Sequence, residues 1–318
     1  MKKLQCRFLK FIVFAAIFFA IGAIAEEPAQ IKPVVEGKEF QNNSYLANQG
    51  NVIAQYNVGT MYATGIGVAK DTAKAIEWLS KAAGQGHVAA QYNLGLVYGT
   101  NNNVQNNLKA VEWYTKAANQ GYAKAQYRLG EIYSIGISVP KDLTTAAKWF
   151  SKAALQGDAL AQYNLGALYA SGEGVEKNQS KAIDMYTKAA SQNVAEAQYN
   201  LGLIYSLGLG LLKDQAKAAE WYTRSANQGY AEAEFNLGNM YATGDGVPKN
   251  QTKAVEWYTK AANHKLTEAQ YNLGLMYYYG VGVTRDLTKA AQWYAKAANQ
   301  GYAKAQIKLD AMYANGEC

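Results

Sequence analysis

The chain has few of the residues that build catalytic or metal sites, because its 318 residues include only 2 Cys and 2 His. Metal sites need clusters of His, Cys and carboxylates, and a nucleophilic triad needs a base held beside a Ser or Cys. His87 and His264 stand far apart, and neither has a partner at a fixed offset. The composition therefore predicts a protein that is not an enzyme and that holds no cofactor and no metal.

Long hydrophobic runs are also missing, except near the N-terminus. There the apolar stretch 11–20 follows four basic residues and precedes Ala23-Ile24-Ala25. This order is typical of a secretory signal peptide, residues 1–25, and an uncleaved N-terminal anchor is the alternative. We therefore expect an exported protein, periplasmic or secreted, with no stable membrane anchor after cleavage.

An excess of one charge is largely missing too. The formal net charge of +7 falls to +3 without residues 1–25, since that segment carries four basic residues and no acidic one. So small a charge disfavours a nucleic-acid partner. Cys6 leaves with the signal peptide, and Cys318 is then the last thiol, available for a disulfide between two chains.

What the chain has in excess is 25 Tyr and 29 Gly, and a repeated unit explains both. Each copy predicts two short helices joined by a glycine loop, and a unit this small cannot bury its apolar face alone. The predicted fold is an all-α superhelical solenoid of seven helix-turn-helix repeats over residues 54–304. The copies begin at Ala54, Ala90, Ala125, Ala161, Ala197, Ala233 and Ala269.

Within a copy, a glycine recurs in the first helix, although it costs about 1 kcal/mol relative to Ala. Close approach of the second helix explains Gly59, Gly95, Gly130, Gly166, Gly202, Gly238 and Gly274. The second helix is predicted to start after an N-cap at Asp71, Asp142, Asn178, Asp214, Asn250 or Asp286. It should end at a left-handed residue such as Gly301. Lys265 occupies that position once and predicts a strained or differently turned junction.

The two ends of the array are less regular. Residues 26–39 contain two prolines and no helical period, which predicts a flexible leader. Residues 40–53 match the second half of a repeat and are predicted to form an N-terminal cap. Residues 305–318 are predicted to be a C-terminal capping helix, because Asp310 replaces the packing glycine. In the second copy, Asn101–Asn103 replaces the usual Gly-x-Gly.

The full pattern, A-x-Y-N-L-G-x-x-Y-x-x-G-x-G-V-x-x-D-x-x-K-A-x-x-W-Y-x-K-A-A-x-x-G, resembles the Sel-1-like repeat family, which is related to tetratricopeptide repeats. That resemblance implies an adaptor in protein assemblies, associated in exported bacterial proteins with envelope processes. The family's cysteine-rich branch does not fit, since these repeats have no cysteine.

The resemblance also implies that the first helices line a concave groove. An aromatic ladder would then comprise Tyr56, Tyr92, Tyr127, Tyr163, Tyr199, Phe235 and Tyr271, and an amide ladder Asn57, Asn93, Asn164, Asn200, Asn236 and Asn272. Asparagine can donate and accept at once, which suits a peptide backbone. The alternative is that the amides bond between repeats and the rings are core. The position after each packing glycine varies and is where ligand choice could be written: Thr60, Leu96, Glu131, Ala167, Leu203, Asn239 and Leu275.

The third copy departs from the amide ladder. Arg128 replaces Asn, and Lys124 lies one turn earlier on the same face. With Asn93 they resemble the carboxylate clamp of some tetratricopeptide domains, which predicts an acidic or carboxylate-ended ligand. The competing interpretation is that Glu131 neutralises Arg128.

The sequence thus favours an exported scaffold that binds an extended segment or helix of a protein or peptide partner in the groove. A peptidoglycan or polysaccharide binder, with the aromatic ladder stacking on sugars, is the second hypothesis. A cell-wall or β-lactam hydrolase is the third.

Overall fold

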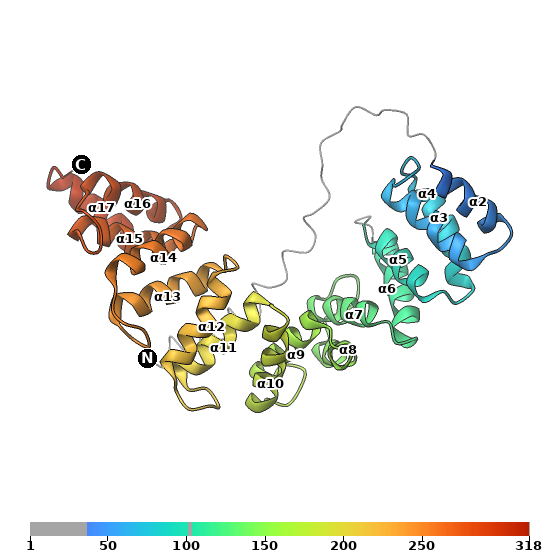
Figure 1. The fold of residues 1–318 in the computed structure, drawn as a ribbon, viewed down its shortest axis with the longest axis horizontal. Coiled ribbons are helices and arrows are strands. Elements are labelled where there is room, and N and C mark those ends of the chain that lie inside the picture. The colour runs from blue at the N-terminus through green and yellow to red at the C-terminus, as the bar shows by residue number, and fades with distance from the viewer. Residues whose placement is uncertain (1–36, 101–103, 318) are drawn as a thin grey trace. The chain divides into compact units, whose positions relative to one another are not determined.

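The computed structural model describes residues 37–100 and 104–317 (Figure 1). The predictions for the signal peptide, most of the leader, Asn101–Asn103 and Cys318 lie outside the described residues. The described chain divides into two compact parts, unit 1 within Met1–Asn178 and unit 2 within Gln179–Cys318, and each is treated by itself.

Unit 1 is built of helices, and consecutive helices pack against each other. In Figure 1 it runs from blue to green. Its helices are α2 (Lys38–Asn48), α3 (Val52–Thr64), α4 (Thr72–Gly84), α5 (Val88–Gly99), α6 (Val104–Asn119), α7 (Ala123–Ile135), α8 (Leu143–Leu155) and α9 (Ala159–Ser171).

Unit 2 repeats the arrangement with α10 (Gln179–Ser191), α11 (Ala195–Leu207), α12 (Gln215–Ala226), α13 (Ala231–Thr243), α14 (Gln251–Asn263), α15 (Thr267–Tyr279), α16 (Leu287–Asn299) and α17 (Ala303–Ala314). No strand occurs among the described residues. The predicted fold class, an all-α helical-repeat solenoid, is confirmed. In the part of the chain that the structure describes, no helix is both long and apolar enough to cross a bilayer.

The packing glycines act as predicted. A Cβ added at Gly130 would lie 2.5 Å from the Phe150 ring, and one at Gly202 would lie 2.5 Å from the Tyr222 ring. The same clash, between 2.6 and 2.7 Å, arises at Gly59, Gly95, Gly238 and Gly274. In these six copies the first helix therefore contacts its second helix through backbone, which explains a residue that is otherwise unfavourable in a helix.

The predicted helix ends are also present. Asp214 accepts a hydrogen bond from the Lys217 amide at 2.9 Å, and Asp71, Asp142, Asn250 and Asp286 cap their helices in the same way. Gly301 has φ +83°, in the left-handed region expected at the end of a second helix. Lys265 has φ +64° and therefore makes the same turn as the glycines. Of the two expectations for this junction, a different turn is wrong, whereas a left-handed conformation is strained for a lysine.

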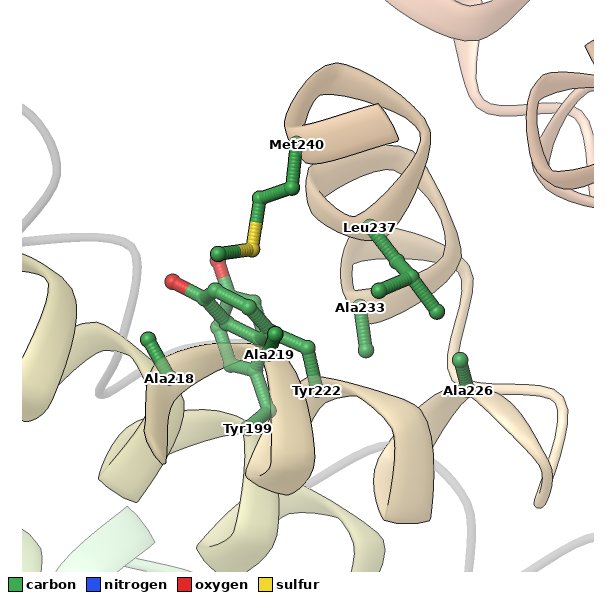
Figure 2. Close-up of a cluster of buried hydrophobic side chains, with 8 residues drawn as sticks. All are labelled: Tyr199, Ala218, Ala219, Tyr222, Ala226, Ala233, Leu237 and Met240. Atoms are coloured by element: carbon green, nitrogen blue, oxygen red, sulfur yellow. The ribbon is translucent and has the colours of Figure 1, made fainter. Parts of the chain in front are cut away.

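The core forms between repeats as well as within them. Figure 2 shows one cluster from α11, α12 and α13, which belong to two successive copies. Its buried members are Tyr199, Ala218, Ala219, Tyr222, Ala226, Ala233, Leu237 and Met240. Since no single helix pair completes this cluster, each copy depends on the next one for burial, as the repeat length predicts.

The terminal helices begin slightly earlier than predicted. Helix α2 begins at Lys38, inside the predicted leader, and α17 begins at Ala303. In α17 the side chains of Ile307 (67% exposed) and Asp310 stand in solvent. Their counterparts in the preceding copy, Tyr271 and Gly274, are covered by α16, because Tyr294 lies over both.

Candidate functional site

The predicted aromatic ladder lies against rings of the chain itself. Five of the ladder rings contact the large ring of their own second helix, with centroids 5.7 Å apart for Tyr92 and Tyr114 and 5.8 Å apart for Tyr199 and Tyr222. Tyr127, Phe235 and Tyr271 make the same contact with Phe150, Tyr258 and Tyr294. Tyr163 is itself buried, at 6% exposed.

Several of these rings meet a second ring, which lies at the N-cap of the next first helix. Tyr56 lies 4.7 Å from the His87 ring, and Tyr199 lies 5.0 Å from the Tyr230 ring. Tyr92 with Tyr122 and Tyr271 with Tyr302 repeat this arrangement. Rings at these distances are in contact, so these ladder aromatics pack where one copy joins the next. This geometry fits the interpretation of the aromatics as core.

The phenols at these contacts are removed from water. Burial raises the pKa of Tyr199 and Tyr222, and hydrogen bonds from Asn236 offset part of that rise. Burial likewise raises the pKa of Tyr258 to about 12, offset in part by Asn272. These phenols are neutral across physiological pH, so they serve as packing and hydrogen-bonding groups.

The amide ladder also bonds mostly within the chain. The Asn93 Nδ2 donates to the Tyr56 hydroxyl at 3.4 Å and to the Thr60 Oγ1 at 3.3 Å, both in the preceding copy. Asn236 and Asn272 bond the tyrosines named above, which also precede them. Asn57 donates to Asn43 of α2, Asn164 donates to the Leu160 carbonyl, and Asn200 is buried. Most of these amides therefore link adjacent repeats.

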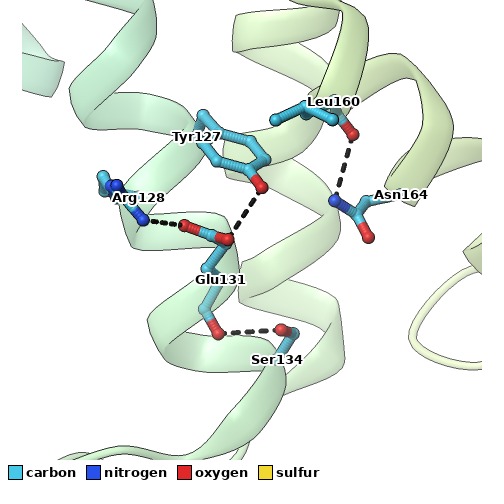
Figure 3. A network of polar contacts seen from close by, with 6 residues as sticks. All are labelled: Tyr127, Arg128, Glu131, Ser134, Leu160 and Asn164. Carbon is cyan, nitrogen blue, oxygen red and sulfur yellow. Dashed lines mark hydrogen bonds and ion pairs between the residues drawn. The ribbon is translucent and has the colours of Figure 1, made fainter. Parts of the chain in front are cut away.

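Arg128 is already paired (Figure 3). Its guanidinium lies 2.9 Å from Glu131 Oε2, and the Tyr127 hydroxyl donates to Glu131 Oε1 at 2.7 Å. Burial lowers the pKa of Arg128, but the Glu131 carboxylate and the Tyr92 hydroxyl outweigh that effect and raise it. The structure thus has the neutralised arrangement. A carboxylate-ended ligand at Arg128, Lys124 and Asn93 would have to displace Glu131.

A network of buried glutamines was not predicted from the sequence. The Gln270 Nε2 donates to the Ala262 carbonyl at 3.1 Å, and its Oε1 accepts from Gln300 Nε2 at 2.8 Å. Gln55, Gln91, Gln126 and Gln198 make the same two bonds, to the end of the preceding helix and to Gln85, Gln120, Gln156 and Gln228. The signal was present in the sequence, because a glutamine precedes the ladder aromatic in nearly every copy.

At one contact between copies, a glutamate and a histidine take the place of the two glutamines. Glu234 stands where Gln is usual and is 2% exposed, and His264 Nδ1 lies 2.9 Å from its Oε2. Two positions that sequence alone left unrelated are thus partners in space. His264, one of the two histidines of the chain, therefore contributes to packing between copies.

The tryptophans are covered by cations three residues later in the same helix. Lys116 Nζ lies 3.8 Å from the Trp113 ring centroid, and Lys296 Nζ lies 3.8 Å from that of Trp293. Trp78, Trp149, Trp221 and Trp257 are covered in the same way by Lys81, Lys152, Arg224 and Lys260. These rings present a cation, rather than an open face, to solvent.

The first helices share a partly exposed face that differs between copies. Leu203 and Leu275 on this face also contact the core, and Asn239 accepts a hydrogen bond from the Tyr258 hydroxyl at 2.6 Å. In unit 2 this face carries Glu196, Glu232 and Glu268 near the helix starts and Leu207 and Tyr279 near two of the ends, the last two being 54% and 59% exposed. Leu203, Asn239 and Leu275 lie between them and are half-buried. We call these eight residues the unit 2 face. Among the described residues, no group of three His, Cys, Asp or Glu side chains is placed to hold a metal ion.

The arrangement defines a class of protein. Side chains that contact neighbouring helices repeat from copy to copy, and the exposed face varies, which is the design of a helical-repeat binding scaffold. The Sel1 repeat model matches residues 52–87, 88–122, 123–158, 159–194, 195–230, 231–266 and 267–302. The chain belongs to the Sel1 repeat family. Each match begins two residues before the predicted copy, near the start of the first helix.

Two solved structures are similar over most of this chain. A Sel1 repeat protein from Oxalobacter formigenes is 31% identical with a TM-score of 0.72, covering 98% of this chain and 90% of that one. A protective antigen of uropathogenic Escherichia coli with an SLR fold is 34% identical with a TM-score of 0.82, covering 86% of this chain. This chain spans 59% of the length of the E. coli protein. No curated protein sequence matches this chain.

Sel1 repeat proteins generally act as protein–protein interaction scaffolds and bind protein partners. Their fold is typically non-catalytic. The fold and the coarse function thus agree with the resemblance read from the repeat.

Proposed function

We propose that this protein is an exported scaffold that binds an extended segment or a helix of a protein partner along the first helices of its repeats, without chemistry. The observation that carries the proposal is the contrast between a repeated interior and a varied exterior. Leu203, Asn239 and Leu275 occupy one position in three successive copies, directly after a packing glycine that does not change. A surface of that kind recognises shape and charge rather than a transition state.

The unit 2 face also suggests what a partner carries. Three glutamates recur at one position, beside exposed apolar side chains of α11 and α15. A partner segment with basic residues along one side and apolar residues along the other complements this pattern. The first-helix position that carries these glutamates holds Ile53, Ala89, Lys124 and Leu160 in unit 1, so the two units select different segments.

Export is proposed from the N-terminal sequence. Cleavage after Ala25 would give a mature chain beginning at Glu26. Mass measurement of the mature protein from fractionated cells tests this directly. A full-length mass, or a chain found only in the cytoplasm, would remove the export part of the proposal and leave the binding part standing.

The binding part is tested by site-specific photo-crosslinking in the native compartment. A photoreactive residue is placed singly at Leu203, Asn239 and Leu275, and in matched controls at Glu220, Glu256 and Gln292, which are exposed on the second helices. We expect one recurring protein adduct from the first set and none from the second. Adducts that form equally well from both sets would contradict binding at the first-helix face.

The other functions lose support from the geometry. The ladder rings contact protein rings, and the tryptophan faces are covered by cations, so stacking on sugars has little ring surface available. Sedimentation with purified cell wall should therefore leave the protein in solution. A turnover assay on purified glycan or β-lactam should show no hydrolysis.

A further inference from the structure

The loop between α11 and α12 presents leucines to solvent. Leu212 is 92% exposed, and Leu211 is 37% exposed. In the next two copies, Pro248 and Thr284 stand where Leu212 does. Apolar side chains held in water at a protruding loop are unfavourable by themselves, and such a patch marks an interaction site.

The loops of unit 2 lie side by side along one edge. A Cβ added at Gly282 would lie 2.5 Å from the Gln251 carbonyl oxygen, at the start of the preceding second helix, and Gly246 approaches Gln215 in the same way. The Gln179 Nε2 donates to the Leu209 carbonyl at 3.3 Å. Each loop therefore contacts the helix start that follows the previous loop. We call loops 208–214, 244–250 and 280–286, with the first helical turn after each, the loop edge.

The loop edge is the cationic part of unit 2. It carries six exposed cationic side chains and three carboxylates, whereas the rest of the unit has eight cations and nine carboxylates. The cations are Lys213, Lys217, Lys249, Lys253, Arg285 and Lys289, and the carboxylates are Asp214, Asp245 and Asp286. Lys217 and Lys289 pair with aspartates at 3.6 and 3.3 Å, which offsets part of their charge.

The remaining loop cations have a common arrangement. The Lys213, Lys249 and Arg285 side chains start close to the glycine that ends the first helix, with their Cβ atoms 3.1 to 3.3 Å from a Cβ built there. All three side chains are exposed. The Arg285 Nε also donates to the Tyr278 carbonyl at 3.1 Å, which holds this side chain against the end of α15. Exposed leucines flanked by such cations match a membrane interface, where apolar groups enter the acyl boundary and cations meet anionic headgroups.

We propose that the loop edge of unit 2 binds the surface of an anionic lipid bilayer, with Leu211 and Leu212 inserted between headgroups. The contact is peripheral and reversible, and it leaves the unit 2 face free for a protein partner. It does not depend on the proposed scaffold function. A free phosphate would account for the cations but not for the leucines, whereas a bilayer accounts for both.

Vesicle flotation of the mature chain tests the proposal. Vesicles of phosphatidylglycerol and phosphatidylcholine are compared with pure phosphatidylcholine at low and high salt. We expect flotation only with the anionic vesicles, and its loss at high salt, because screening removes surface attraction. Lys213→Glu/Lys249→Glu should weaken binding about 25-fold or more, at about fivefold per cation near an anionic surface. Leu211→Ser/Leu212→Ser should weaken it about tenfold or more.

Matched control variants distinguish binding by the loop edge from nonspecific binding to vesicles. Leu155→Ser removes another highly exposed leucine, at 85%, from the other unit, and Lys265→Glu/Lys304→Glu reverses two exposed lysines away from the loop edge. Both should float as the unchanged protein does. No flotation with anionic vesicles overturns the proposal. Equal losses in edge and control variants also overturn it, and so does a leucine variant that loses a protein crosslink while keeping its vesicle binding.

Discussion

Units 1 and 2 use the same interior and expose different surfaces. In both units a glycine meets a large side chain of the second helix, and a buried glutamine ties neighbouring copies together. On the first helices, unit 1 has Ile53 and Leu160 where unit 2 has glutamates. Positions that contact another helix have one acceptable size, because interiors are close-packed. Positions that contact solvent are free to differ, and the proposed partner binding uses them.

The largest expected effect comes from filling the packing glycines, and it should be the same in both units. Gly95→Ala in unit 1 and Gly238→Ala in unit 2 each bring a Cβ to 2.6 or 2.7 Å from a tyrosine ring. We expect each to lower the free energy of unfolding by about 2–3 kcal/mol through overpacking. Urea unfolding followed by circular dichroism measures this loss.

Gly84→Ala is the control, since a Cβ there meets nothing within 4 Å. It should leave stability unchanged or raise it by up to about 1 kcal/mol, because Ala is the better helix former. A large loss at only one of Gly95 and Gly238 would break the claim of a common interior.

The next largest effect on stability is expected from the buried glutamine network, which can be compared with the contact between Glu234 and His264. Gln270→Leu leaves the Ala262 carbonyl without its side-chain donor and should cost about 1–2 kcal/mol. At the one exceptional contact, Glu234→Gln/His264→Gln restores the pair found elsewhere and should preserve or raise stability. Thermal unfolding of both variants tests this. If the double variant were the less stable protein, the His264–Glu234 pair would have a role of its own.

Alkaline pH should destabilise unit 2 before unit 1. Burial raises the pKa of Tyr199, Tyr222, Tyr258 and Tyr294 in unit 2 and of Tyr114 and Tyr127 in unit 1, where Phe150 and Leu79 fill two of the second-helix sites that hold tyrosine elsewhere. A phenol is neutral when protonated. The stability linked to these raised pKa values is therefore complete below about pH 10 and is lost as pH rises through the folded values. Hydrogen exchange at rising pH should show unit 2 opening first, and opening of unit 1 first would contradict the assignment.

The smallest effect concerns Arg128. Arg128→Asn restores the usual residue and removes a partly exposed ion pair with Glu131, so stability should change by less than about 1 kcal/mol. Arg128→Glu places two carboxylates together and should cost more. Comparing crosslinked partners of the two variants tests the carboxylate clamp. Unchanged partner binding in Arg128→Glu would exclude it.

Much of the helical repeat could be predicted from the sequence. The recurrence of Gly274, Asp286 and Gly301 at fixed spacing predicted the helix contact, the cap and the turn, since each residue type has few other uses at those places. Lys265 misled, because its left-handed conformation is imposed by the helices on either side. The partnership of Glu234 with His264 was beyond reach, since 30 residues separate two groups that only the stacking brings together.

The sequence by itself determined the repeat, its two helices and the need for neighbours, because those follow from local conformational preference and from apolar spacing. Only the tertiary structure shows what the ladder side chains contact. An aromatic or amide side chain on a helix can face a ligand or the adjacent copy, and the periodicity is the same in both cases. The contacts with Tyr222, Tyr230 and Thr60 place ladder side chains against neighbouring helices, because stacking brings together groups that are distant in the sequence.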